Sequence, residues 1–113
     1  MQIQSLNSGG VSVISPAGSI DALTADELSA FIAQHSDSKQ LVLDLGQVNF
    51  MSSAGLRVIL ATTKNARQHG GDLRLARPQA GVLRTLQMAG FTNITKTFNS
   101  TEEAINSFSS QGA

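Results

Sequence analysis

The fold is decided by residues 40–71, which read QLVLDLGQVNFMSSAGLRVILATTKNARQHGG. Residues 40–45 form a short and nearly continuous apolar run, which is typical of a strand that is covered on both faces. From Ala54 to His69, apolar side chains recur at helical spacing, and Gly70 and Gly71 then supply a left-handed stop. A buried strand followed by a long amphipathic helix indicates an α/β fold.

The segments before this stretch predict a hairpin and a helix. Residues 1–6 and 11–17 are short apolar stretches separated by Asn, Ser and Gly residues of turn type, so we expect two antiparallel strands. Pro16 favours a strand end or an edge position. Thr24 and Glu27 have the spacing of a capping box, which predicts a helix start, with Leu23 packing on Leu28.

The segments after residue 71 continue the alternation. We expect a strand at residues 72–76, a helix between Pro78 and Gly90, a strand at 94–98, and a last helix capped by Ser100 and Glu103. The sequence therefore predicts an α/β fold with a mixed sheet of four or five strands. About four helices pack mainly on one side, and residues 40–45 form the central strand.

Length and composition narrow the class of protein. A chain of 113 residues fits one domain, which we take to span residues 1–113. Eight Lys and Arg balance eight Asp and Glu, so net charge provides no attraction to nucleic acid or to an anionic membrane. No apolar run approaches the ~18 residues of a membrane span, and the start lacks a signal-peptide pattern. We expect a cytoplasmic protein.

The sequence offers no chemistry for an enzyme. It has no Cys, no Gly-rich phosphate loop and no Gly-x-Ser-x-Gly elbow. The two His residues, His35 and His69, fall at the ends of predicted helices, where a structural role is the simplest interpretation. We therefore expect no catalytic residue, no metal and no cofactor.

The junction between the central strand and the long helix is the candidate site, because sites gather at the carboxyl ends of strands in open α/β sheets. Ser52 or Ser53 is expected to cap the helix. One interpretation is that these serines have no role beyond capping the helix. The other is that an exposed Ser at a helix start carries a phosphate, which the positive end of the helix would favour. Arg57 lies one turn further on, where the helix dipole disfavours a cation, and this also suggests a site.

The stretch from Phe50 to Leu60 resembles the signature of bacterial anti-sigma factor antagonists, the STAS domain family, whose usual form is Phe/Ile-x-Asp-Ser-Ser/Thr-Gly-Leu before an apolar helix. The resemblance extends to residues 18–21 (GSID), 43–45 (LDL) and 73–76 (LRLA), and so spans most of the chain. It implies a partner-switching regulator of transcription that binds an anti-sigma factor with Ser kinase activity and releases a sigma factor.

Matched position by position, the resemblance implies that Ser53 is the phosphorylated residue. Ser52 stands where the family usually has Asp, Ala54 replaces the second Ser or Thr, and Arg57 replaces a frequent Gly. Asp21 matches an acidic position of the family. The residues implied in partner binding are Asp21, Ser52, Ser53, Ala54, Gly55 and Arg57.

Three functions are compatible with these observations. The leading hypothesis is an anti-sigma factor antagonist that phosphorylation of Ser53 inactivates and that a Ser phosphatase restores. The second is a non-switching STAS scaffold or transporter-associated subunit, in which Ser53 has only a capping role. The third, an enzyme or nucleotide-binding domain, is supported only by analogy of fold.

Overall fold

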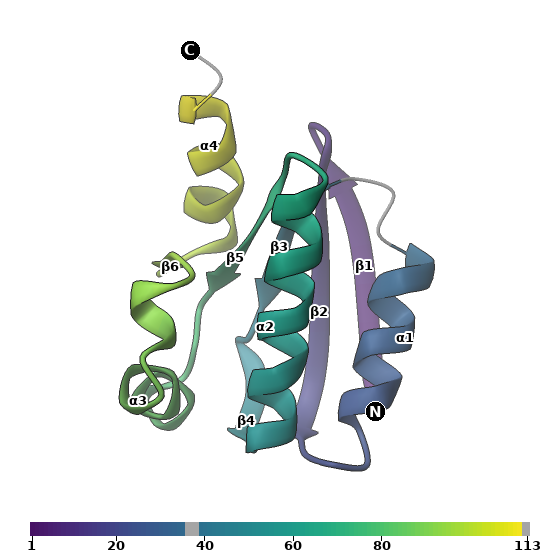
Figure 1. The fold of residues 1–113 in the computed structure, drawn as a ribbon, viewed down its shortest axis with the longest axis vertical. Helices are drawn as coiled ribbons and strands as arrows, with labels where there is room; N and C mark the ends of the chain where they lie inside the picture. Colours follow the sequence, from purple (N-terminus) through teal and green to yellow (C-terminus); the bar gives the residue numbers. More distant parts are fainter. Residues whose placement is uncertain (36–38, 112–113) are drawn as a thin grey trace.

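The computed structural model describes residues 1–35 and 39–111 as one sheet with helices on both of its faces (Figure 1). The elements in chain order are β1 (Gln2–Ser8), β2 (Val11–Ile20), α1 (Ala25–His35), β3 (Gln40–Asp44), β4 (Gln47–Met51), α2 (Ser53–Gln68), β5 (Asp72–Ala76), α3 (Ala80–Met88), a 3-10 turn (Phe91–Asn93), β6 (Thr97–Phe98) and α4 (Thr101–Gln111). The predicted alternation of strands and helices is confirmed.

The sheet is mixed, with the strand order β1-β2-β3-β5-β6 and with β4 paired to β2 beyond the end of β3. β1 runs antiparallel to β2, and all other pairs are parallel. The strand formed by residues 40–44 is central, as predicted, and its residues Leu41 to Asp44 are all buried. Buried strands of this kind need apolar side chains on both faces, which explains the unbroken run.

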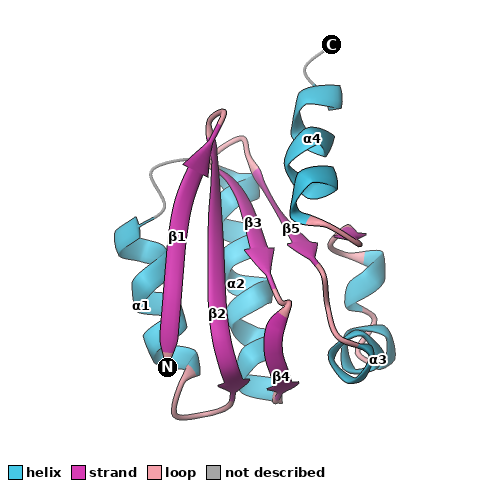
Figure 2. Cartoon of the chain, turned by 180° about the vertical axis from the view of Figure 1, so that it is seen from behind, coloured by secondary structure: helices cyan, strands magenta, loops and turns pink. Residues whose placement is uncertain are grey.

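The core lies on both sides of the sheet. The larger cluster joins α1, α2 and α3 to one face through side chains such as Leu28, Ile59 and Leu86. The smaller cluster joins α4 to the other face through Ala104 and Phe108. Three of the four described helices therefore pack on one side, and Figure 2 shows β1, β2 and β3 from the side opposite α1 and α2.

The sheet has six strands, so the prediction of four or five was too low. The missed strand is β4, in which only Val48 and Met51 are buried, because it is an edge strand that pairs with β2 alone. Such a strand shows little apolar alternation in its sequence. The predicted strand at residues 94–98 shortens to Thr97–Phe98, because Ile94 still belongs to the end of the 3-10 turn.

Pro16 lies inside β2 and not at its end, which corrects the prediction. β2 pairs with β3 up to Ile14 and with β4 from Ala17 onward. Pro16 therefore falls where β2 changes neighbours, and the missing N–H of a proline costs no ladder bond on that side.

The first predicted capping box is also wrong, whereas the second is confirmed. The Thr24 hydroxyl donates to the Ser19 carbonyl oxygen (2.7 Å), and no bond links it to Glu27 among the described residues. Leu23 is 84% exposed and so does not pack on Leu28. At α4, the Glu103 N–H donates to the Ser100 hydroxyl oxygen at 3.1 Å, as expected.

Candidate functional site

The candidate site forms where β2 and β4 end side by side. Ile20 and Met51 are paired in the sheet, and the Ser52 N–H donates to the Ile20 carbonyl oxygen at 2.9 Å. The loop that starts at Asp21 and the first turn of α2 therefore emerge together at one end of the sheet (Figure 1). Five of the six predicted partner-binding residues lie within residues 52–57, at the start of α2, and Asp21 follows the strand end beside them.

Asp21 shapes the loop between β2 and α1. One of its carboxylate oxygens accepts the N–H groups of Leu23 (2.9 Å) and Thr24 (3.1 Å). These bonds favour the charged form, so the backbone N–H groups of Thr24 and then Leu23 lower the pKa of Asp21 below its usual value. The Asp21 carboxylate thus accepts the backbone N–H groups just before α1, whereas the sequence predicted that the Thr24 hydroxyl would cap this helix.

Ser52 and Ser53 have different roles. Ser52 is the N-cap of α2: its hydroxyl oxygen accepts the Ala54 N–H at 3.2 Å, and its side chain is half-buried. Ser53 is the first residue of the helix, is exposed, and has no hydrogen-bond partner for its hydroxyl among the described residues. The hydroxyl that the helix needs is therefore that of Ser52, and that of Ser53 is free.

The first turn of α2 carries no acidic side chain, so the partial positive charge of the helix end is not balanced there by a carboxylate. Gly55 is buried, and a Cβ atom at this position would lie 2.7 Å from Met51 Cγ and 2.9 Å from Ile20 Cγ2. The absence of a side chain at Gly55 therefore lets α2 approach the ends of β2 and β4. Gly55 positions the site and does not present a side chain to a partner.

Arg57 is exposed on the next turn and lines a hollow of about 270 Å³ between the first turns of α1 and α2. Ala54 and Asp26 line the same hollow. Arg57 has no ion-pair partner among the described residues. Its guanidinium is therefore available to a group that arrives at the first turn of α2.

Two exposed apolar side chains flank these residues and were not predicted as part of the site. Leu23 follows Asp21 and is 84% exposed, and Phe50 precedes the Ser pair and is 53% exposed. The sequence pattern placed Leu23 against the core, because it has the spacing of a hydrophobic staple. Only the position of the Asp21 loop in the structure reveals that the Leu23 side chain points to solvent.

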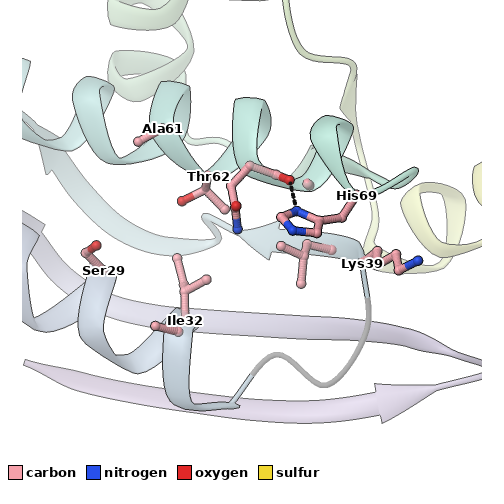
Figure 3. A pocket seen from close by; sticks show the side chains of 10 residues that line it. Ser29, Ile32, Lys39, Ala61, Thr62 and His69 are labelled. Atoms are coloured by element: carbon pink, nitrogen blue, oxygen red, sulfur yellow. Dashed lines mark hydrogen bonds between the residues drawn. The ribbon is translucent and has the colours of Figure 1, made fainter.

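A larger hollow of about 430 Å³ lies between the C-terminal halves of α1 and α2 and is lined by Ile32, Thr62 and His69 (Figure 3). His69 Nδ1 donates to the Asn65 carbonyl oxygen at 2.8 Å, and His35 Nδ1 bonds the Phe31 carbonyl oxygen at 3.1 Å. Both bonds tie a ring to its own helix, which agrees with the structural role expected for each His. Within the described part of the chain, no three His, Asp or Glu side chains gather as metal ligands would.

Comparison with known proteins identifies the family. The STAS domain profile matches residues 2–104. The chain belongs to the STAS domain family. A relative in Bordetella bronchiseptica, named "Putative anti-sigma factor antagonist BtrV", is 37% identical over 93 residues, which are 80% of this chain and 80% of that protein. This STAS chain is thus a member of the anti-sigma factor antagonist group.

Solved structures of other proteins share the fold. The anti-sigma factor antagonist of Mycobacterium paratuberculosis superposes with a TM-score of 0.85 at 25% identity, covering 94% of this chain and 92% of that one. The murine anion transporter Slc26a9 matches with a TM-score of 0.74 at 17% identity, covering 85% of this chain and 17% of that one, which shows a common fold alone. No helix within the described ranges of this chain is both long and apolar enough to cross a bilayer.

Proposed function

We propose that this STAS chain is a phosphorylation-switched anti-sigma factor antagonist. In its unmodified form it binds an anti-sigma factor that has Ser kinase activity, and so releases a sigma factor. Phosphorylation of Ser53 by that partner ends the binding, and a Ser phosphatase restores it. The observation that carries the proposal is the free, exposed hydroxyl of Ser53 at the start of α2.

Ser53 is a better phosphoryl acceptor than its neighbour for a local reason. The Ser52 hydroxyl is half-buried and is occupied by the Ala54 N–H, so its modification would remove the cap of α2. Modification of Ser53 would leave that bond in place. The phosphate would meet the unbalanced positive end of the helix, and the Arg57 guanidinium lies one turn along the same helix.

The switch acts through the surface and needs no change of fold. The exposed Leu23, in the loop after β2, and Phe50, near the end of β4, offer apolar contact area in the two segments that end near Ser53, and such side chains gain by being covered. A phosphate carries roughly −1.5 to −2 charges at neutral pH. Placed inside a packed interface without a matching cation, such a charge costs several kcal/mol of binding free energy.

The proposal also states in which cellular compartment this chain acts and what its role is in phosphoryl transfer. An anti-sigma factor and its kinase activity belong to the cytoplasm, and we propose that this chain acts there. The chain would be a substrate for phosphoryl transfer and not a catalyst of it. Its sequence has no Gly-rich phosphate loop, and among the described residues no three His, Asp or Glu side chains gather as metal ligands would.

Intact-mass measurement tests the modification directly. The chain is incubated with ATP and a candidate anti-sigma kinase, and in parallel with ATP alone. We expect the mass of one phosphoryl group to be added only with the kinase, to be lost in Ser53→Ala, and to persist in Ser52→Ala. Phosphorylation of Ser53→Ala to the same extent would contradict the assignment, and no modification by any cognate kinase would favour a scaffold in which Ser53 has no switching role.

A further inference from the structure

A second polar site is formed by side chains of β1, β2 and β4 together with Asp44 and Arg77. Figure 2 shows these strands from the side opposite α1 and α2. The site is a hollow of about 420 Å³ lined by Gln2, Gln4, Ser15, Ala17, Asp44, Gln47 and Arg77. The hollow forms where β2 changes its neighbour from β3 to β4, because no strand pairs with β2 between Ile14 and Ala17 on that side. It shares no residue with the Ser53 site.

The hollow contains one guanidinium in a fixed position. Arg77 Nε donates to one oxygen of the Asp44 carboxylate (2.9 Å), and Arg77 Nη2 donates to the other (3.0 Å). The Gly46 N–H also donates to Asp44 at 3.0 Å. A Cβ atom at Gly46 would lie 2.3 Å from Arg77 Nη2, so the guanidinium occupies space that only a glycine leaves open.

The backbone at Arg77 is strained to allow this arrangement. Its φ is 55°, and it is the only residue other than glycine with a positive φ within residues 1–35 and 39–111. Glycine or asparagine would relieve this strain. The ion pair accounts for the cation, because the Asp44 side chain is only 11% exposed and a buried carboxylate needs a positive partner. The pair in turn fixes the guanidinium at the wall of the hollow, where its remaining N–H groups can meet a ligand.

The remaining polar side chains that line the hollow are uncharged and can form hydrogen bonds. Gln2, Gln4 and Gln47 carry carboxamides and Ser15 a hydroxyl, and none of these side chains has a hydrogen-bond partner among the described residues. Carboxamides and hydroxyls each donate and accept. Arg77 Nη1 adds two further N–H donors, and the Asp44 oxygens retain lone pairs.

We propose that this hollow binds a small uncharged polyhydroxy compound, such as a cyclic polyol or a monosaccharide. Hydroxyl groups match side chains that both donate and accept, and neighbouring hydroxyls match the paired Arg77 donor and Asp44 acceptor. A net anion is a poorer fit, because Asp44 already balances the single cation of the hollow. The volume is within the usual range of small-molecule sites.

Titration followed by NMR of backbone amides and of the Arg77 Nε–H tests the proposal. Myo-inositol and glucose are the neutral probes, and citrate and inorganic phosphate are the anionic ones. We expect a neutral probe to give saturable shifts confined to residues 2–4, 15–17, 44–47 and 77. The absence of saturable shifts with both neutral probes overturns the proposal, and so does preferential binding of either anion.

Two variants and a control separate binding from folding. Arg77→Gly removes the guanidinium and relieves the positive φ, but it also leaves the buried Asp44 carboxylate without its cation. The variant should therefore lose some stability and bind the probe about tenfold or more weakly. Gln4→Thr should weaken binding less and keep the strand. Arg84→Gln, an exposed charge on α3, should bind as the wild type does. If Arg77→Gly binds the probe as the wild type does, or if Gln4→Thr leaves the affinity unchanged, the hollow is not the binding site and the proposal fails.

Discussion

The Ser52 N–H donates to the Ile20 carbonyl oxygen at 2.9 Å, so the start of α2 is fixed directly to the end of β2. This one bond places the Asp21 loop, which follows Ile20, beside the Ser53 hydroxyl, which follows Ser52. The two segments are far apart in the sequence, and the parallel pairing of β2 with β4 brings them to one surface.

The division of roles between the two serines predicts different effects on stability. Ser52→Ala removes the cap of α2 and should lower the free energy of unfolding by about 1 kcal/mol. Ser53→Ala removes an exposed hydroxyl without a partner and should change the free energy by less than about 0.5 kcal/mol. Urea denaturation of both variants measures the difference. A larger loss for Ser53→Ala would mean that Ser53 is the true cap.

Gly55 should be intolerant of any side chain. Gly55→Ala places a methyl group against Met51 and Ile20, so we expect a loss of about 1 to 3 kcal/mol in unfolding free energy. Gly81→Ala is the matched control, because Gly81 is exposed in α3 and an added Cβ would contact nothing within 4 Å. It should be neutral or stabilising by up to about 1 kcal/mol. Equal stability of the two variants would contradict the close packing of α2 on β2 and β4.

Asp21 should contribute to acid stability. Its pKa is lowered in the folded chain, so its contribution is present above the unfolded value, near 3.8, and is lost as pH falls through the folded value. Asp21→Asn should therefore be less stable than the wild type at neutral pH, with the two converging below about pH 4. Asp26→Asn, in the first turn of α1, controls for the loss of one carboxylate. Parallel stability curves for wild type and Asp21→Asn across this range would refute the role of the charged loop.

Arg57 should act only after modification. A phosphate at Ser53 and a guanidinium four residues later form an i, i+4 pair, which stabilises a helix by about 0.5 kcal/mol. Arg57→Gln should therefore lower the stability of the phosphorylated chain and leave the unmodified chain nearly unchanged. Arg84→Gln is the control for charge. Thermal unfolding of the wild type and of the two variants, each with and without phosphate at Ser53, measures this difference. An equal effect of Arg57→Gln in both states would contradict the pairing.

Much of the fold follows from local sequence patterns, because the decisive segments bury one recognisable face. The run at residues 40–45 and the long helix that ends just before the Gly70–Gly71 pair are of this kind, and both were predicted. β4 was missed because an edge strand buries only two of its five side chains, Val48 and Met51. Six strands therefore formed where four or five were expected.

The site was only partly predictable. The sequence indicated the start of α2 and left Ser52 and Ser53 undecided as caps, because either residue has the right side chain. Only the direction of the chain after Met51 assigns the cap to Ser52. The role of Asp21 in capping its own loop and the exposure of Leu23 depend on where β2 ends, and this is set by pairing with β4 and not by local pattern.

Substitutions at Ser53 should separate binding from folding. Ser53→Asp places one negative charge at the surface and should weaken binding of the anti-sigma partner while slightly stabilising α2 through the helix dipole. Ser53→Ala should bind as the unmodified chain does and should stay bound when kinase and ATP are present. Calorimetric titration together with urea denaturation measures both properties. If Ser53→Asp loses stability in proportion to binding, the effect lies in folding and not in the surface.

The most direct test compares the affinity of the anti-sigma partner for the unmodified chain and for the chain phosphorylated at Ser53, each verified by intact mass. Isothermal titration calorimetry of the two forms at the same salt concentration measures both affinities. The account predicts that phosphorylation weakens binding by roughly a hundredfold or more, the consequence of a desolvated charge in the interface. Equal affinity of the two forms would contradict the switch and leave Ser53 as an ordinary first residue of α2.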